Sequence, residues 1–497
     1  MASRPPARCV MVLGTTSGAG KSWLATALCR HYTRQGLKVA PFKAQNMSNN
    51  ARVVGEGEIG SAQFLQALAA KAEPDVRMNP LLLKPESDTH SQVVLLGQVR
   101  ADLGVMPWRE RSGHVWPAIT AALDALRAEC DVVVIEGAGS PAEINLADCD
   151  IVNLRVARHA DAACLLVTDI DRGGALAHLY GTWALLHESD RSRIKGFVLN
   201  KFRGDPALLE PGPQRLQDLT GVLTVAVLPM WWQHGLPEED GVMHARPEVQ
   251  GVVARTIAVV ATPRISNLDE FQPLNQLPGV RLKWARGPAD LAGADWVILP
   301  GSKHTSSDLA CLRAQGLDRA IAAHAAQGGA VLGICGGLQM LGEALIDPHG
   351  IDGNAPGLGL LPLVTVFAPA KTVQRTQARF GSLAGPWAAL AGVSVAGYEI
   401  HHGQTAQHPA MAAAGDLARV ALTGPQGEPL GWQNATGNVL GVYLHGLFED
   451  AAVLQALFGA SVPTLDGVFD GLADFVERHF APGALEALVA ESGSTGA

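Results

Sequence analysis

Short apolar runs alternate with amphipathic stretches along the first half of the chain. These runs are continuous, which is typical of strands buried on both faces of a sheet. A helical period follows the first run at residues 21–34. Apolar strands separated by helices predict a parallel sheet covered on both faces, an α/β architecture. The strands predicted in this half are residues 9–13, 132–135, 163–168, 196–199 and 225–228.

The alternation stops near Gly235 and later starts again. Residues 236–250 are rich in Pro, Gly and charged residues, so we expect them to link two domains. Beyond them the pattern predicts strands at residues 256–260, 280–284, 296–299, 330–334 and 439–442, and helices at 306–313 and 317–327. We therefore expect an N-terminal α/β domain at 1–235, a linker at 236–250, a second α/β domain at 251–450, and a helical appendage with a tail at 451–497.

Composition narrows the class of protein. A chain of 497 residues with 47% hydrophobic and 17% charged residues can build two or three large cores. A net charge of −9 without a Lys/Arg run argues against nucleic acid as a partner. Seven cysteines without CxxC pairs are typical of a reducing compartment, and no apolar stretch approaches the roughly 18–20 residues of a membrane span. We expect a cytoplasmic enzyme with no membrane partner.

A glycine-rich loop, GTTSGAGKS from Gly14, follows the first predicted strand and opens the first helix. Backbone N–H groups in such a loop point at phosphate oxygens, and the helix dipole adds to the attraction. Lys21 is expected to neutralise the terminal phosphates of ATP, and Ser22 to bind Mg²⁺. The first glycine stands one residue early, where the usual spacing would place it at Thr15. The residues predicted to bind ATP here are Thr15, Gly18, Gly20, Lys21 and Ser22.

Polar residues that follow other strands of this half are expected at the same edge of the sheet. Glu136 ends a buried strand and is a candidate Mg²⁺ ligand beside the phosphates, or else a strand-capping carboxylate. Asn200 closes a later strand and is a candidate for reading a purine edge, or an ordinary turn residue. Lys43 and Gln45, in PFKAQNMSNN, are candidates for holding an anionic acceptor, although polar clusters are more often solvated loops.

A second such segment, TDIDRGG, contains Asp171 and Arg172. These two side chains would contact substrate or Mg²⁺, or would form an internal ion pair. The sequence does not separate these two interpretations.

A cysteine flanked by glycines marks a second site. Gly333-Ile-Cys335-Gly336-Gly337 lies between a predicted strand and a helix, where a strained turn exposes a nucleophile and the helix N-terminus favours the thiolate. The alternative is a buried structural cysteine. His445 follows the strand at 439–442 and is the preferred base, with His401 and His402 as competitors. Oxyanion or glutamine contacts are expected from Gly301, Ser302, Gly336 and Gln339.

The segments GTTSGAGKS, PFKAQNMSNNA, NPLLLKP, SQVVLLG, VIEGAGSPAEINL, TDIDRGG, LPGSKHT, GICGGLQMLG, GYEIHHG and YLHGLF together resemble, in order, the signatures of the cobyric acid synthases of cobalamin biosynthesis. The resemblance extends from about residue 10 to residue 448. It implies an N-terminal P-loop domain similar to dethiobiotin synthetase, which shares the displaced glycine, and a C-terminal class I, triad-type glutamine amidotransferase domain.

The same resemblance implies the activity. ATP, with Mg²⁺, would activate the b, d, e and g side-chain carboxylates of adenosylcobyrinic a,c-diamide, and ammonia from glutamine would amidate them. Cobalt would be present only within this corrinoid substrate. Cys335 would be the nucleophile and His445 its base. Triad glutaminases usually carry a Glu two residues after this His, but here Leu447 stands there. The third member is therefore open: the site would work as a Cys–His dyad, or Glu399 would orient a ring from elsewhere.

Three other functions remain as alternatives. The sibling synthase that amidates the a and c carboxylates has the same two domains, but PFKAQNMSNNA and the chain length favour cobyric acid synthase. An amidase of lipid-linked peptidoglycan precursors usually carries its glutaminase on a separate chain. A P-loop switch ATPase with a degenerate amidase module would have no use for Cys335 and His445 together.

Overall fold

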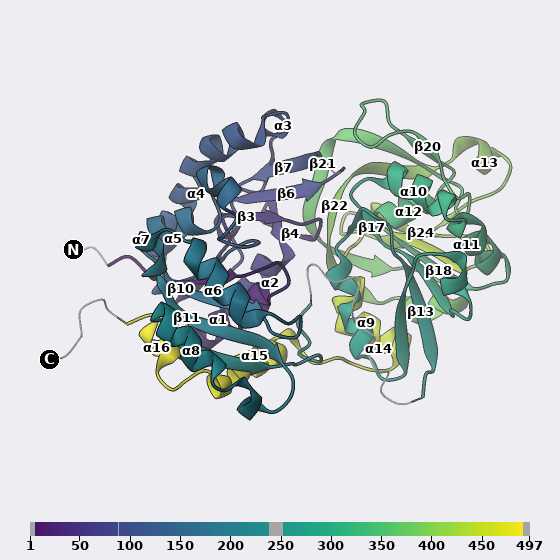
Figure 1. Ribbon diagram of the computed structural model, residues 1–497. Coiled ribbons are helices and arrows are strands. Elements are labelled where there is room, and N and C mark those ends of the chain that lie inside the picture. The colour runs from purple at the N-terminus through teal and green to yellow at the C-terminus, as the bar shows by residue number, and fades with distance from the viewer. Residues whose placement is uncertain (1–4, 88, 238–251, 491–497) are drawn as a thin grey trace.

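A computed structural model describes residues 5–87, 89–237 and 252–490. The chain forms two lobes, the first from the N-terminal half and the second from the C-terminal half (Figure 1). The expected linker, residues 236–250, lies outside the described residues except for its first two positions. Its extent therefore stays a prediction.

The first lobe is built on a six-stranded parallel sheet, in the order β12-β11-β10-β1-β9-β2. Its strands are β1 (Arg8–Gly14), β2 (Val39–Phe42), β9 (Val132–Glu136), β10 (Ala163–Asp169), β11 (Ile194–Phe202) and β12 (Thr224–Pro229). Its larger helices are α1 (Lys21–Arg34), α4 (Trp108–Glu129), α5 (Leu154–Ala160), α6 (Ala175–Leu185) and α8 (Gly212–Thr220). The predicted parallel sheet and the helix at 21–34 are confirmed. Both faces are apolar, because alternate residues of each strand enter two separate hydrophobic cores.

The first lobe also contains small elements that the apolar pattern does not predict. A four-stranded sheet is formed by β3 (Gln45–Met47), β6 (Leu81–Pro85), β7 (Ser91–Leu95) and β8 (Gln98–Val99). Next to it lie the hairpin of β4 (Ala51–Val54) and β5 (Gly57–Gly60), and the helix α2 (Ser61–Ala69). The hairpin and α2 lie where the two lobes meet, and β4 contacts strands of the second lobe.

The second lobe has a mixed sheet. Its parallel part follows the order β15-β13-β16-β18-β25 and consists of β13 (Arg255–Val260), β15 (Val280–Ala285), β16 (Trp296–Leu299), β18 (Ala330–Ile334) and β25 (Val439–Val442). Helices α10 (Thr305–Ala314), α11 (Leu317–Ala326) and α12 (Gly336–Leu341) accompany it. The predicted α/β architecture of this half is confirmed.

An antiparallel part extends the same sheet beyond β25. It contains β21 (Leu363–Phe380), β22 (Ser394–Gln407), β23 (Arg419–Thr423) and β24 (Pro429–Gln433). The long β21–β22 hairpin reaches the first lobe (Figure 1). Two short strands, β14 (Ile265–Ser266) and β17 (Gly301–Ser302), pair separately beside β16.

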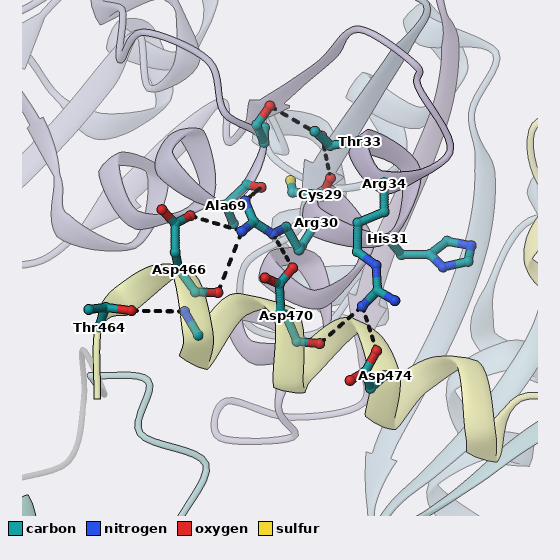
Figure 2. Close-up of polar contacts among 12 residues, drawn as sticks. Cys29, Arg30, His31, Thr33, Arg34, Ala69, Thr464, Asp466, Asp470 and Asp474 are labelled. Carbon is teal, nitrogen blue, oxygen red and sulfur yellow. Dashed lines mark hydrogen bonds and ion pairs between the residues drawn. The ribbon is translucent and has the colours of Figure 1, made fainter. Parts of the chain in front are cut away.

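The C-terminal segment divides between the lobes. Helix α14 (Ala451–Phe458) packs in the second lobe, whereas α15 (Leu465–His479) and α16 (Ala484–Ala487) return to the first and cover α1. Figure 2 shows the polar contacts of this return: Arg30 of α1, 2% exposed, pairs with Asp466 and Asp470 at 2.8 Å each. The helix that opens at the glycine-rich loop is thus held from outside by the far end of the chain.

Within the described residues, no helix combines the length and the apolar character needed to cross a bilayer. Each of the seven cysteines is a free thiol.

Candidate active sites

The glycine-rich loop joins β1 to α1 and holds its shape through contacts with neighbouring strands. Gly20 has a φ of 99°, in the left-handed region, and a Cβ added there would lie 2.1 Å from the Asn200 amide nitrogen. That nitrogen donates a hydrogen bond to the Ala19 carbonyl oxygen at 2.9 Å. Asn200, at the edge expected from the sequence, therefore binds the loop itself. Glycine at position 20 is required by both the turn and this close approach.

Thr15, the second residue of the glycine-rich loop, is held by the neighbouring strand β10. Its hydroxyl donates to the Thr168 hydroxyl at 2.9 Å, and its backbone N–H donates to the Val167 carbonyl at 2.9 Å. Both donors are thus engaged by β10, because the displaced first glycine leaves Thr15 still in register with the sheet. These contacts anchor the loop to the sheet, and phosphate binding by Thr15 stays a prediction.

The predicted Mg²⁺ ligands lie together at the end of β9. The Ser22 hydroxyl donates to Glu136 Oε1 at 2.8 Å, and Lys43 Nζ, from the turn after β2, donates to the same oxygen at 2.7 Å. Burial would raise the pKa of Glu136, but the Lys43 charge and the hydrogen bonds from Lys43, Gln66 and Ser22 outweigh it and lower that pKa. Glu136 is therefore held as a carboxylate.

Two glutamines that the sequence analysis did not identify complete the surroundings of Glu136. Gln66 Nε2 donates to Glu136 Oε2 at 2.6 Å, and Gln63 Nε2 lies 3.3 Å from the same oxygen. Both belong to α2, where a spacing of three residues puts them on one face. That spacing was visible in the sequence, but nothing local connected it with Glu136.

Glu136, Ser22 and Lys43 line a cavity of about 1460 Å³. The predicted residues on its wall are Gly18, Gly20, Lys21, Ser22, Lys43, Gln45, Glu136 and Asn200. Aromatic side chains of Trp23, Trp231 and Phe475 form another part of the wall, and Phe475 of α15 stacks on Trp231 with ring centroids 4.8 Å apart. The cavity thus has a polar end at the glycine-rich loop and an apolar wall to which the C-terminal helix contributes.

The Asp171–Arg172 segment also lines this cavity, but its charges are paired internally. Arg203 Nε donates to Asp171 at 2.8 Å, and Arg172 Nε lies 3.4 Å from Asp169. Of the two interpretations left open, the structure shows the ion pairs.

Cys335 lies at the sharp turn between β18 and α12. Its φ of 51° and ψ of −104° are unusual for a residue with a side chain, and such strain is typical of nucleophiles held at strand-to-helix turns. The residue is 4% exposed. The thiol lies at the N-terminus of α12, between small residues. It lines a small pocket of about 60 Å³.

His445 lines the same small pocket as Cys335, whose thiol donates a hydrogen bond to the Ile400 carbonyl oxygen at 3.7 Å. On its other side, His445 Nδ1 lies 3.1 Å from Glu270 Oε1, and Glu270 Oε2 accepts the Gly446 N–H at 3.0 Å. Burial would lower the pKa of His445, but Glu270 and Cys335 raise it above its ordinary value. Burial raises the pKa of Glu270. His445 thus lies between a buried carboxylate on one side and the thiol pocket on the other.

Glu270 is the third member that the sequence left open. It belongs to a short 3-10 turn, Leu268–Phe271, that precedes His445 by 175 residues in the chain. Leu447 is fully buried in the apolar core. Glu399, the alternative considered above, instead lies 3.2 Å from His401 Nε2.

The competing histidines are engaged elsewhere. His401 Nδ1 lies 2.8 Å from the Gly403 carbonyl oxygen, and His402 Nδ1 lies 3.1 Å from the Ala368 carbonyl oxygen. Both rings line the small pocket, as do Cys335 and His445.

The predicted oxyanion and glutamine contacts gather around the thiol. Gly301 and Ser302 form β17, and a Cβ added to Gly336 would lie 2.7 Å from the Ser302 amide nitrogen. Gln339 and Ser302 line the small pocket, and Gln339 Oε1 accepts the Thr305 hydroxyl at 3.1 Å. The backbones of β17 and α12 thus approach each other closely beside Cys335, and the oxyanion role of their amides stays a prediction.

The small pocket is closed by residues of the first lobe. Asn49 and Lys84 line it together with Lys371 of β21. Both lysines pair with Glu58, with Lys84 Nζ at 2.8 Å and Lys371 Nζ at 2.5 Å. The thiol site therefore lies at the boundary between the lobes, with positive charge on one wall.

Comparisons with known proteins cover both lobes. Residues 10–232 match the family described as CobQ/CobB/MinD/ParA nucleotide binding domain, and residues 256–453 match the CobB/CobQ-like glutamine amidotransferase domain. A protein of Variovorax paradoxus named cobyric acid synthase is 76% identical over 97% of this chain and 99% of its own length. Proteins of the same name from Polaromonas sp. and Methylibium petroleiphilum are 73% identical (97% of this chain, 99% of theirs) and 65% identical (99% and 98%).

Proposed function

The chain belongs to the cobyric acid synthase family, and from this premise we propose that it converts the b, d, e and g side-chain carboxylates of adenosylcobyrinic a,c-diamide into amides, with ATP and glutamine as co-substrates. One observation carries the proposal: a buried Cys335–His445–Glu270 constellation and a phosphate loop facing Glu136 occur in one chain, in lobes that share an interface.

The second lobe would release ammonia from glutamine. The Cys335 thiolate attacks the side-chain amide carbon, and the oxyanion that forms accepts hydrogen bonds from the Gly336 and Ser302 amides. His445 gives its proton to the departing nitrogen, so ammonia leaves and a thioester remains. Water, deprotonated by His445, then hydrolyses the thioester to glutamate. Glu270 holds the ring in position throughout.

The first lobe would use that ammonia. An acceptor carboxylate attacks the γ-phosphorus of ATP and displaces ADP, which gives an acyl phosphate. Ammonia attacks the acyl carbon and phosphate leaves, so an amide is formed. Lys21, whose Nζ lies 2.9 Å from the Thr16 carbonyl oxygen and 3.1 Å from that of Gly139, is positioned above the loop to neutralise phosphate charge.

Mg²⁺ fits the donors at this site. A hydroxyl and a carboxylate, Ser22 and Glu136, lie 2.8 Å apart at the loop, and Mg²⁺ in nucleotide sites commonly takes one or two protein oxygens together with phosphates and water. When bound there, the ion would neutralise phosphate charge.

The acceptor would occupy the rest of the large cavity. A volume of about 1460 Å³ exceeds the roughly 300–1,000 Å³ of typical small-molecule pockets, as a nucleotide together with a corrinoid would require. Lys43 and Gln45 lie on its wall, and Lys43 is positioned to share its charge between Glu136 and an acceptor carboxylate. A cytoplasmic location stays a prediction.

Mass spectrometry of the corrinoid tests this function. Incubation of adenosylcobyrinic a,c-diamide with the protein, ATP, Mg²⁺ and glutamine is expected to convert four carboxylates stepwise into amides. Cobyrinic acid serves as the comparison substrate. ATP hydrolysis without amidation of the a,c-diamide, or amidation of cobyrinic acid at its a and c positions instead, would refute the proposed substrate.

A further inference from the structure

One short segment of the second lobe, residues 266–270, separates the two sites. Ser266 and Asn267 line the small pocket beside Cys335, whereas Asp269 lines the large cavity of the first lobe. Glu270, the next residue, binds His445. The position of this segment therefore affects both the wall between the sites and the carboxylate that orients the histidine.

Residues of the first lobe hold the segment by reciprocal hydrogen bonds. The Ala51 N–H donates to Asn267 Oδ1 at 3.1 Å, and the Leu268 N–H donates to Asn50 Oδ1 at 3.0 Å. Asn267 has a φ of 54°, a left-handed conformation that asparagine tolerates better than most residues. The turn that presents Glu270 is thus completed by the other lobe.

Arg52, in β4 of the first lobe, is at the centre of this contact. It is 5% exposed, and its guanidinium donates to Asp269 and, through two nitrogens at 2.8 and 2.6 Å, to both oxygens of Glu449. Its Cζ atom also lies 5.1 Å from the centroid of the Tyr398 ring, within cation–π range. The three partners all belong to the second lobe.

Each of these partners is directly connected with the histidine or its carboxylate. Asp269 precedes Glu270, and Glu449 ends the short turn, Leu447–Glu449, that follows His445. The Tyr398 ring stacks on the His445 ring with centroids 5.4 Å apart and an interplanar angle of 21°. The backbones of these two residues also exchange hydrogen bonds of 2.9 and 3.2 Å.

We propose that Arg52 is a positioning residue of the glutaminase, supplied by the synthetase lobe, which fixes the Glu270–His445 pair through Asp269, Glu449 and Tyr398. This inference rests on the proposed function, because it assigns a role within the glutamine-hydrolysing step. A planar guanidinium can satisfy two carboxylates and a ring face at once, which an ammonium cannot.

The same guanidinium reaches toward the ATP site. Arg52 Nε lies 3.3 Å from the hydroxyl of Ser61, the first residue of α2, and α2 carries Gln63 and Gln66, which bind Glu136. Arg52 is therefore in contact both with the residues around His445 and with the helix that holds Glu136. This placement makes glutamine hydrolysis depend on a correctly docked synthetase lobe.

The test compares Arg52→Met with the wild type in two assays: glutamine hydrolysis, and amidation driven by ammonium without glutamine. Removal of Arg52 is expected to lower the kcat of glutamine hydrolysis about 100-fold with little change in KM, because a displaced histidine impairs the reaction more than binding. The acidic limb of its pH profile is expected to move to higher pH, since Asp269 and Glu449 then lose their counter-charge beside Glu270, His445 and Tyr398. Ammonium-driven amidation is expected to persist. Arg52→Lys should recover part of the loss.

Arg375→Met is the matched control. Arg375 lies at the same interface, where its Nε lies 3.3 Å from the Val53 carbonyl oxygen and its side chain pairs with Glu73 rather than with Asp269 or Glu449. It is expected to leave glutamine hydrolysis near the wild-type rate.

Wild-type kcat in Arg52→Met, or an equal loss in Arg375→Met, would overturn the proposal. If Arg52→Met does not fold, as judged by loss of ammonium-driven amidation, Glu449→Gln is measured in its place and should show the same loss of kcat. A wild-type chain that hydrolyses no glutamine would instead refute the proposed function itself, before any Arg52 variant is compared.

Discussion

Glu270 shows most clearly what a single residue contributes to the site. It is fully buried, and its two oxygens bind the His445 ring and the Gly446 N–H. Glutamine has nearly the same shape but cannot balance a protonated imidazole. Glu270→Gln is therefore expected to lower the kcat of glutamine hydrolysis by about 100- to 10,000-fold, as loss of a triad carboxylate does elsewhere.

Steady-state kinetics with glutamine, beside ammonium-driven amidation of the corrinoid, would measure this effect. The ammonium reaction should remain at the wild-type rate, because Glu270 binds His445 and does not line the ATP cavity. Glu399→Gln is the comparison, since Glu399 binds His401. A larger loss of kcat in Glu399→Gln than in Glu270→Gln would show that Glu399, and not Glu270, orients the catalytic histidine.

The sequence could identify Cys335 and His445 because each stands at a strand end within a local motif. It could not identify Glu270, because the carboxylate comes from a short turn far upstream and its pairing depends on how two chain segments pack. Arg52 was equally hidden, since an arginine in a short strand gives no local sign of what it contacts across an interface. The contact of Thr15 with Thr168 was hidden for the same reason, because it joins residues 153 positions apart.

At the scale of elements, the parallel strands were predictable because they are buried on both faces and therefore continuously apolar. The β21–β22 hairpin was not, since many of its residues alternate between buried and exposed positions and include polar side chains. The strands β3 to β5 are three or four residues long, too short for any period to be visible. Of these unpredicted elements, β4 and β5 contact the hairpin at the interface.

The hairpin is fastened to the first lobe by a buried charge cluster, which predicts a pH dependence. Burial would raise the pKa of Glu58, but Lys371 and Lys84 hold it down to about 2, below its ordinary value of 4.5. Because the folded pKa is depressed, the stabilisation is present above the unfolded pKa and is lost as pH falls from about 4.5 toward 2.

Thermal unfolding midpoints between neutral and acidic pH would test this. Glu58→Gln is expected to unfold at lower temperature than the wild type at pH 7, because it leaves two buried lysines without their counter-charge, and to show a weaker decline on acidification. Glu73→Gln, which removes an exposed carboxylate from the same interface, should match the wild type. If the unfolding midpoints of the wild type and Glu58→Gln fall equally on acidification, the acid sensitivity does not come from Glu58.

Helix α15 is the second element with a testable role. Leu472 is fully buried in the core that α15 shares with α1 and β12. Leu472→Ala is expected to lower the free energy of unfolding by about 2–5 kcal/mol, the usual cost of such a core truncation. Denaturant unfolding would measure this loss of stability. Arg478→Ala, at an exposed position of the same helix, is the control, and its free energy of unfolding is expected within about 0.5 kcal/mol of the wild type. An unchanged free energy of unfolding in Leu472→Ala would mean that α15 contributes little to the stability of the first lobe.

At the scale of the whole molecule, two chemistries share one interface. The thiol pocket opens against residues of the first lobe, and a single segment of the second lobe divides it from the ATP cavity. Enclosure keeps ammonia unprotonated and protects an acyl phosphate from water. The chain crosses between lobes a second time before α15, so the C-terminus contributes Phe475 to the cavity. Such long-range returns have no signature in a single sequence, because only the folded topology brings the segments together.

The central claim is that ammonia made at Cys335 is consumed at the phosphate loop of the same chain. The most direct test is amidation of adenosylcobyrinic a,c-diamide by Cys335→Ala, followed by mass spectrometry, with ATP, Mg²⁺ and either glutamine or ammonium. The account predicts no amide with glutamine and stepwise conversion of four carboxylates with ammonium. Amidation by Cys335→Ala with glutamine at the wild-type rate, or failure of ammonium to restore it in a folded protein that still hydrolyses ATP, would contradict the account.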